Sequence, residues 1–238
     1  MKLIYLKHSG FLLCGNDFNM VIDYIKGRSD VFGIIENYAL NTAKPLYVLA
    51  SHHNQDHFDS SVLTWRLKSG DSPVYIFSGD ITGTKTSEQK VVFINAGEEY
   101  SDGVVHLKTF GSTDEGVSFY IEADDKRIFH AGDLNNWHWD EESTPEEVRE
   151  SENAYLKELA VAEQEIKNLD LAMFPIDIRL GSGYMRGAEQ FLDGIKVKLF
   201  APMHFWGRFD TLPPFKDYAE KCGTKVVLWR TEGQEVEF

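Results

Sequence analysis

The residues best suited to chemistry are three histidines and an aspartate in the segment Ser51-His52-His53-Asn54-Gln55-Asp56-His57. Imidazole nitrogen and carboxylate oxygen are the ligands that divalent transition metals take in proteins. The segment follows the apolar run 45–50, which is typical of a strand covered on both faces. A short loop at the end of such a strand can direct several side chains toward one ion. The sequence therefore predicts a metal-dependent enzyme.

Two further ligand-type residues follow predicted strands elsewhere in the chain. Asp133 comes after the predicted strand 127–130 and a glycine, and His204 comes after the predicted strand 197–201. Taken alone, Asp133 would be interpreted as part of a surface turn, and His204 as a histidine buried in the core. Parallel and mixed sheets bring the ends of several strands to one edge, so residues far apart in sequence can converge there. We therefore expect both residues to join the histidine segment.

The elements that must position these residues alternate between strands and helices. Closely spaced strands at 2–7, 11–14 and 19–23 predict an antiparallel meander. Thr144, Pro145 and Glu147 form a capping pattern at the start of a long helix. Further strands are expected at 45–50, 74–77, 91–94, 104–109, 117–122, 127–130, 171–174, 197–201 and 226–229, and helices at 30–40, 60–67, 145–169, 188–195 and 214–222. The pattern predicts an α/β fold over residues 1–238 as one domain: a four-layer αββα sandwich, two mixed sheets packed face to face with helices outside.

Composition limits the class of protein and its partners. The chain has 238 residues, of which 42% are hydrophobic, and a formal net charge of −14. These values indicate a globular protein, and the charge argues against nucleic acid as a partner. No export signal or apolar run of membrane-spanning length is apparent, so we expect a cytoplasmic protein that makes no membrane contact. The two cysteines, Cys14 and Cys222, lie far apart and are expected to be unpaired thiols. We expect a small-molecule substrate and leave a homo-oligomer open.

Taken together, these motifs resemble the metallo-β-lactamase fold superfamily, the αββα metallohydrolases, over nearly the whole chain. The first motif of that family, His-x-His-x-Asp-His, corresponds to residues 52–57, its late aspartate to Asp133 and its final histidine to His204. The early sequence His8-Ser-Gly-Phe11 resembles the branch that includes ascorbate-6-phosphate lactonase.

Two residues depart from the family pattern. Asn54 stands in place of the second histidine, and alignment of Gly116-Val-Ser-Phe119 on a family strand places Ser112 where another histidine is expected. The resemblance implies one degraded metal position that retains only His52. It also implies one complete position, made by Asp56, His57, Asp133 and His204. We expect one or two divalent ions, with zinc first and manganese or iron as alternatives.

The same resemblance implies a metal-dependent hydrolase of a small ester, lactone or phosphodiester. Asp56 and Asp133 would hold the ion and orient water, and His52 would serve as a ligand or as a general base. Asp114, His138 and Arg179 are candidates for substrate binding, each with a structural role as the alternative, and Asp114 is also a candidate replacement ligand. A non-catalytic protein that binds a metal or ligand through the same fold is the alternative function.

Overall fold

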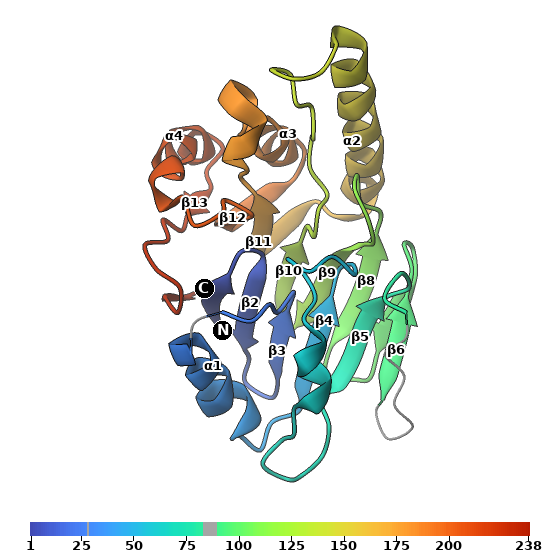
Figure 1. Cartoon of the computed structure of the whole chain (residues 1–238), viewed down its shortest axis with the longest axis vertical. Helices are drawn as coiled ribbons and strands as arrows, with labels where there is room; N and C mark the ends of the chain where they lie inside the picture. The colour runs from blue at the N-terminus through green and yellow to red at the C-terminus, as the bar shows by residue number, and fades with distance from the viewer. Residues whose placement is uncertain (28, 83–89) are drawn as a thin grey trace.

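The structure is a computed structural model that describes residues 1–27, 29–82 and 90–238. Two seven-stranded sheets form its centre, and helices flank them, as Figure 1 shows. The first sheet has the order β14-β1-β2-β3-β4-β5-β6 and the second the order β13-β12-β11-β10-β9-β8-β7. The predicted α/β class, with two mixed sheets and helices outside, is confirmed.

The first sheet begins with the predicted meander. Strands β1, β2 and β3 pair antiparallel, whereas β3, β4, β5 and β6 are parallel neighbours. Strand β4 is buried along its whole length because it lies between two strands and is covered on both faces. The strands are β1 (Lys2–Lys7), β2 (Gly10–Cys14), β3 (Asn19–Ile22), β4 (Leu46–Ala50), β5 (Val74–Ser78), β6 (Val91–Ile94) and β14 (Glu235–Glu237).

The second sheet combines an antiparallel half with a parallel half. Strands β9 and β10 form a hairpin, in which Asp124 and Asp125 adopt φ values of 52° and 58°. Two consecutive positive φ values are those of the type I′ turn that suits a tight hairpin. Strands β10, β11 and β12 are parallel neighbours. The strands are β7 (Glu99–Ser101), β8 (His106–Phe110), β9 (Ser118–Ala123), β10 (Lys126–His130), β11 (Asn168–Pro175), β12 (Lys196–Met203) and β13 (Lys225–Val226).

Helices cover the outer faces of the two sheets (Figure 1). The helical elements are α1 (Ser29–Ile35), η1 (Glu36–Leu40), η2 (Ser60–Thr64), α2 (Pro145–Glu165), η3 (Ile178–Gly183), α3 (Arg186–Gly194), η4 (Phe209–Thr211) and α4 (Pro213–Lys221). The predicted capping box of Thr144 and Glu147 is present at the start of α2. In the part of the chain that the structure describes, no helix is long and apolar enough to cross a membrane.

Several predicted element bounds are wrong. The helix expected at 60–67 is only a 3-10 turn that ends at Thr64. Helix α2 ends at Glu165, so Leu169, which continues its apolar spacing, belongs instead to β11. The last strand expected at 226–229 is reduced to the two residues of β13, and the edge strands β7 and β14 were not predicted. Short edge strands carry too few alternating residues to stand out in a sequence.

Apolar side chains between the sheets hold the two halves together. Tyr5 and Phe11 from the first sheet and Phe119 and Phe129 from the second are all buried in one cluster. A second cluster packs the outer face of the first sheet against α1 and the segment around Trp65. Each fully buried side chain of this size contributes roughly 1.5–3 kcal/mol relative to an exposed one.

One close contact joins the loops that follow β4 and precede β9. The Val117 backbone N–H donates to the Ser51 carbonyl at 2.9 Å. Gly116 makes this approach with a φ of +70°, and a Cβ atom there would lie 1.9 Å from the Ser51 oxygen. Glycine is therefore required at this position for two reasons: it adopts the positive φ without strain, and it has no Cβ atom to clash with Ser51.

Gly116→Ala should lower the free energy of unfolding by roughly 2–5 kcal/mol, because a left-handed alanine costs about 1–2 kcal/mol and overpacking adds about 1–3 kcal/mol. Gly97→Ala is the matched control, since Gly97 has a φ of +83° and nothing within 4 Å of the new Cβ. Urea unfolding followed by circular dichroism measures both changes. Equal losses in the two variants would contradict the proposed contact.

Candidate metal centre

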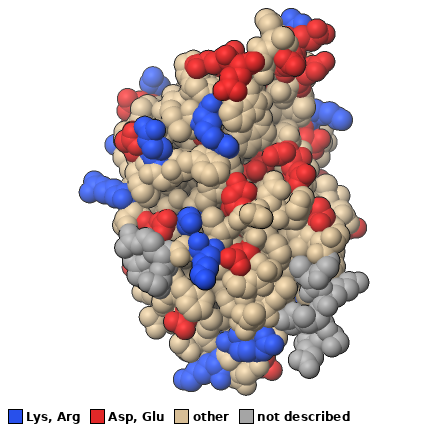
Figure 2. Space-filling model, in the orientation of Figure 1, with Lys and Arg blue, Asp and Glu red and all other residues tan. Residues whose placement is uncertain are grey.

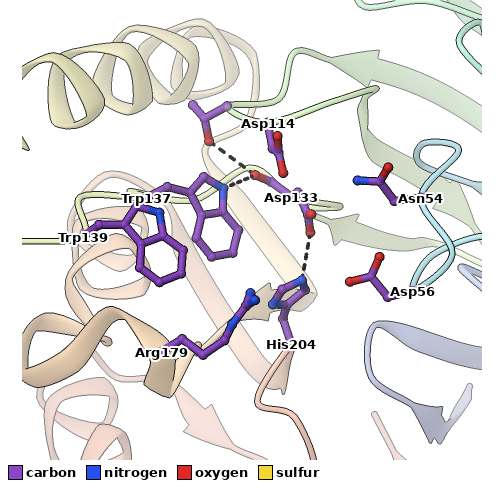
Figure 3. A pocket seen from close by; sticks show the side chains of 9 residues that line it. Asn54, Asp56, Asp114, Asp133, Trp137, Trp139, Arg179 and His204 are labelled. Carbon is purple, nitrogen blue, oxygen red and sulfur yellow. Dashed lines mark hydrogen bonds and ion pairs between the residues drawn. The ribbon is translucent and has the colours of Figure 1, made fainter. Parts of the chain in front are cut away.

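The loops at one edge of the two sheets carry the candidate ligands. Strand β4 leads into the loop with His52, Asp56 and His57, whereas Asp133 follows β10 and His204 follows β12. These five residues, predicted from the sequence as a metal site, converge on one region of the molecule. Figure 3 shows that Asp133, Asp56 and His204 meet there from different elements.

Asp133 lies at the middle of the histidine cluster. Its Oδ1 atom is 3.1 Å from His57 Nε2 and 3.4 Å from His204 Nε2, and its Oδ2 atom is 3.5 Å from His52 Nε2. All four side chains are buried. A carboxylate between three imidazoles has the spacing of ligands that share a cation.

Asp56 faces a histidine that the sequence analysis did not assign to the site. His8 lies in the turn between β1 and β2, and its Nε2 atom is 3.4 Å from Asp56 Oδ2. The ring of His8 also packs against that of His204, with centroids 4.1 Å apart. His8 stands alone in the sequence, with no other ligand-type residue at a characteristic spacing from it. The sequence therefore contained no signal for His8 beyond the quoted His-Ser-Gly-Phe.

The donor atoms that face one another have no other partners. Among the described residues, Nε2 of His8, His52, His57 and His204 and Oδ1 of Asp133 are buried without a hydrogen bond. A buried polar atom left unsatisfied costs about 1–3 kcal/mol, and such atoms are rare in proteins. Several of them at one place fit a bound cation, because neutral imidazole and carboxylate are the forms that ligate metals. The residues present therefore suit a divalent ion.

Two buried carboxylates, Asp23 and Asp177, orient His57 and His204 by binding the ring nitrogens that face away from the cluster. Asp23 accepts a hydrogen bond from His57 Nδ1 at 2.8 Å and from the backbone N–H and hydroxyl of Ser51, both at 2.7 Å. Asp177 accepts one from His204 Nδ1 at 2.8 Å. These contacts hold a proton on Nδ1, so in the neutral ring that binds a metal each Nε2 lone pair is directed at the cluster. Carboxylate–histidine pairs of this kind fix ligand orientation in metal sites.

Burial and charge set the protonation of the cluster. Burial alone would raise the pKa of Asp133, but His57 and His204 outweigh it and hold that pKa well below its usual range. Burial lowers the pKa of His8 to about 4 and also lowers that of His52, so both rings are neutral near neutral pH. Burial would likewise lower the pKa of His57, but the carboxylates of Asp133 and Asp23 raise it.

A cavity of about 290 Å³ opens onto this cluster. Its lining combines three of the predicted ligands with aromatic and polar side chains: Asn54, Asp56, Thr113, Asp114, Asp133, Trp137, Trp139, Arg179 and His204. Figure 3 shows the two tryptophans and Arg179 on one side and Asp114, Asn54 and Asp56 on the other. Burial, followed by the nearby Asp133 carboxylate, raises the pKa of Asp114.

Arg179 and Asp114 line this cavity, as the prediction of substrate contacts requires, but His138 does not. The His138 ring is buried, its Nε2 donates to the Gly183 carbonyl at 3.1 Å, and its Nδ1 accepts from the Asp140 backbone N–H at 3.2 Å. Both nitrogens thus support the loop, and we leave His138 out of the proposed site. His53 is exposed and pairs with Asp80 and Glu115 away from the buried cluster.

Asp23→Asn should weaken zinc binding about 10- to 100-fold, the usual cost of losing a partner behind a metal ligand. Asp102→Asn is the matched control, because Asp102 accepts hydrogen bonds from Tyr47 and Tyr100 outside the donor cluster. Titration of the metal-free proteins with zinc, followed by calorimetry, measures both affinities. Equal affinity in Asp23→Asn and the unmodified protein would contradict this role for Asp23.

Comparison with solved structures supports the fold. The chain resembles Igni18, a metallo hydrolase from the archaeon Ignicoccus hospitalis KIN4/I, with 19% identity, a TM-score of 0.64 and coverage of 100% of this chain and 98% of that one. It resembles the metallo-beta-lactamase fold protein YhfI from Bacillus subtilis with 13% identity, a TM-score of 0.65 and coverage of 99% and 98%. It also resembles CmlA, a diiron beta-hydroxylase from Streptomyces venezuelae, with 10% identity, a TM-score of 0.63 and coverage of 100% and 54%.

Sequence comparison shows the family. A search of curated proteins found no significant match. The finer resemblance to the ascorbate-6-phosphate lactonase branch stays a prediction. A family model described as the beta-lactamase superfamily domain matches residues 2–148, which is more than half of the chain. The chain therefore belongs to the beta-lactamase superfamily and has its metallo-β-lactamase fold.

Proposed function

We propose that this protein is a metal-dependent hydrolase of a small ester, lactone or phosphodiester. The observation that carries the proposal is the group of buried imidazole nitrogens around Asp133 at a cavity, which have no hydrogen-bond partner in the described part of the chain. A divalent ion at such a site lowers the pKa of coordinated water and polarises a carbonyl or phosphoryl oxygen. Zinc is our first candidate, with manganese and iron as alternatives, because the donors are nitrogen and oxygen without a thiolate.

The ligand roles follow from the contacts. Asp56, His57, Asp133 and His204 are the residues that would hold the ion. His52 lies beside His57 and approaches the other oxygen of Asp133, Oδ2, at 3.5 Å, where it would be a weak ligand or would accept a proton from water at Nε2. Its pKa is lowered by burial, so the ring is in the neutral, proton-accepting form at neutral pH.

The second metal position of the family lacks two of its donors in this chain. Asn54 contributes a neutral side chain to the cavity lining, and the Ser112 hydroxyl accepts a hydrogen bond from the Asp114 backbone N–H at 3.4 Å. Only His52 and the shared Asp133 remain there, with Asp114 nearby in the lining. We therefore propose one well-formed ion position and a second, degraded one.

The wall opposite the carboxylates suits a small anionic substrate. Arg179 binds Asp177 through Nε, at 3.0 Å, and through Nη2, at 2.6 Å, so the guanidinium is held in a fixed plane. It stacks 4.5 Å from the Trp206 ring and 5.6 Å from the Trp139 ring. A held guanidinium between aromatic rings presents its remaining N–H groups to a carboxylate or phosphate and the rings to a planar group. The cavity volume of about 290 Å³ fits a small molecule.

Surface charge argues against a long polyanion as substrate. Figure 2 shows acidic side chains gathered at the end of the molecule where α2 begins and again near the middle of the same face. Lysine and arginine are scattered between them and form no continuous stripe on that face. Together with the net charge of −14, this distribution opposes binding of DNA or RNA.

His57→Ala should abolish both ion binding and hydrolysis, because His57 belongs to both donor groups of the buried cluster. We expect losses beyond the roughly 100-fold that accompanies loss of an outer-sphere partner. The test combines elemental analysis with assays on ester, lactone and phosphodiester substrates, before and after chelation. His106→Ala is the control, since His106 is an exposed residue of β8 paired with Glu99 and Glu122. A folded, metal-free wild-type protein would contradict the proposal and favour the non-catalytic alternative.

Arg179→Gln should raise KM for anionic substrates about 10- to 100-fold, because a hydrogen bond to a charged group contributes about 1.5–3 kcal/mol. The kcat value should change little, since the contact is uniform along the reaction. Arg208→Gln, which removes an exposed arginine paired with Asp210, is the control. Metal content measured on the same samples detects any displacement of His204 through Asp177. An unchanged KM would exclude Arg179 from substrate binding.

A further inference from the structure

We propose that His8 is a metal ligand and that the ion held with Asp133 binds in a cage of His8, Asp56, His57 and His204. Each residue of this cage offers one donor atom, and the four atoms lie within 4.8 Å of one another. The inference deepens the proposed function. It rests on that proposal in one respect, namely that a metal ion occupies the site. Together with His57 and His204, His8 would give the ion three imidazole ligands. His8 lies outside the His-x-His-x-Asp-His motif.

The His8 side chain has the burial and direction of a ligand. The residue is 6% exposed, and within the described residues its Nε2 atom has no hydrogen-bond partner. Nε2 lies 3.4 Å from Asp56 Oδ2. Donors at the corners of a tetrahedron around zinc, with bonds of about 2.1 Å, are separated by roughly 3.4 Å. The separation is long for a hydrogen bond and matches two ligands of one ion.

The backbone supports this placement. His8 and His204 have φ values of 55° and 61°, in the left-handed region that residues other than glycine rarely adopt. Their main chains are joined, because the His204 N–H donates to the His8 carbonyl at 3.3 Å. Unfavourable backbone angles of this kind persist where the surrounding structure enforces them, and they concentrate at functional sites. Here they turn two imidazoles from different sheets toward the same point.

Trp206 closes the site on the side of His8. Its ring lies 4.6 Å from the His8 ring and its indole N–H donates to Asp177 at 3.2 Å. Trp206 thus packs on one ligand and contacts the carboxylate that orients another. This packing fixes the His8 rotamer and favours a preformed cage over a side chain recruited after binding.

The cage accounts for the two departures from the family motif. Asn54 and Ser112 remove imidazoles from the side of the site where His52 lies, whereas His8 adds one on the side of Asp56. The ion would therefore bind between Asp56, His57 and His204 rather than beside His52. The competing arrangement is a protonated His8 that forms an ion pair with Asp56 and binds no metal.

Histidine-selective 15N NMR of the protein loaded with one equivalent of zinc separates these arrangements. Zinc-bound ring nitrogens have characteristic shifts, so they can be counted among the eight histidines of the chain. We expect three zinc-bound nitrogens in the wild-type protein and two in His8→Asn. The count should stay at three in His52→Asn, which tests the position beside His52, and in the matched control His106→Asn, where the histidine pairs with Glu99 and Glu122 outside the cluster. Asparagine is chosen at position 8 because it tolerates the left-handed region. Zinc affinity should fall more than about 100-fold in His8→Asn, beyond the loss caused by an outer-sphere partner.

Two results would overturn the inference. One is an unchanged nitrogen count and affinity in a folded His8→Asn, with the fold checked by circular dichroism of the metal-free form. The other is a wild-type count that falls in His52→Asn, which would place the ion beside His52. If His8→Asn does not fold, the wild-type and His52→Asn spectra still decide between the two positions. Because these readouts need no substrate, absence of hydrolysis would count against the proposed function and leave this inference standing.

Discussion

A buried carboxylate surrounded by imidazole Nε2 atoms without a hydrogen-bond partner is the interaction on which this structure depends. Asp133 contacts His57, His204 and His52 through these Nε2 atoms, which no other group among the described residues satisfies. Leaving such atoms buried costs about 1–3 kcal/mol each, a large share of the 5–15 kcal/mol that stabilises a typical domain. A cation removes this cost, since it takes lone pairs from nitrogen and oxygen alike. The folded cluster and the bound ion are therefore coupled.

The surroundings of the cluster are built to keep it in place. Asp23 and Asp177 hold the far nitrogens of His57 and His204, and each of these carboxylates has contacts of its own. Asp23, like His8 and His204, adopts a left-handed backbone angle, with a φ of 48°. The contact of Gly116 with Ser51 locks the loop that carries the ligands against the second sheet. Orientation of the ligands thus comes from residues of both sheets.

The sequence predicted those elements whose burial produces a clear pattern of apolar residues. Strand β4 is covered on both faces, so a continuous apolar run was enough to identify it. Helix α2 was overextended because Leu169 continues its spacing, although it lies in β11. The two-residue strand β13 and the three-residue strands β7 and β14 are too short to show an alternating pattern, and β14 also depends on a partner, β1, at the other end of the chain.

The residues of the candidate site also fall into two groups, those placed by predictable strands and those placed by contacts between distant segments. His52, Asp56, His57, Asp133 and His204 lie together, as the sequence predicted, because each follows a strand and strand ends converge at a sheet edge. The approach of His8 to Asp56 was not predicted because it depends on how the turn after β1 lies against His204. His138 lies outside the cavity lining because closeness to Asp133 in sequence does not fix direction, and its ring turns to Gly183.

The most direct test of the account is anomalous diffraction at the zinc absorption edge from crystals of the zinc-loaded protein. The account predicts one strong peak within bonding distance of His57 and His204, on the side of the cluster where Asp56 lies. An ordered cluster with no peak, or a peak only at surface residues such as His53 and Asp80, would contradict it.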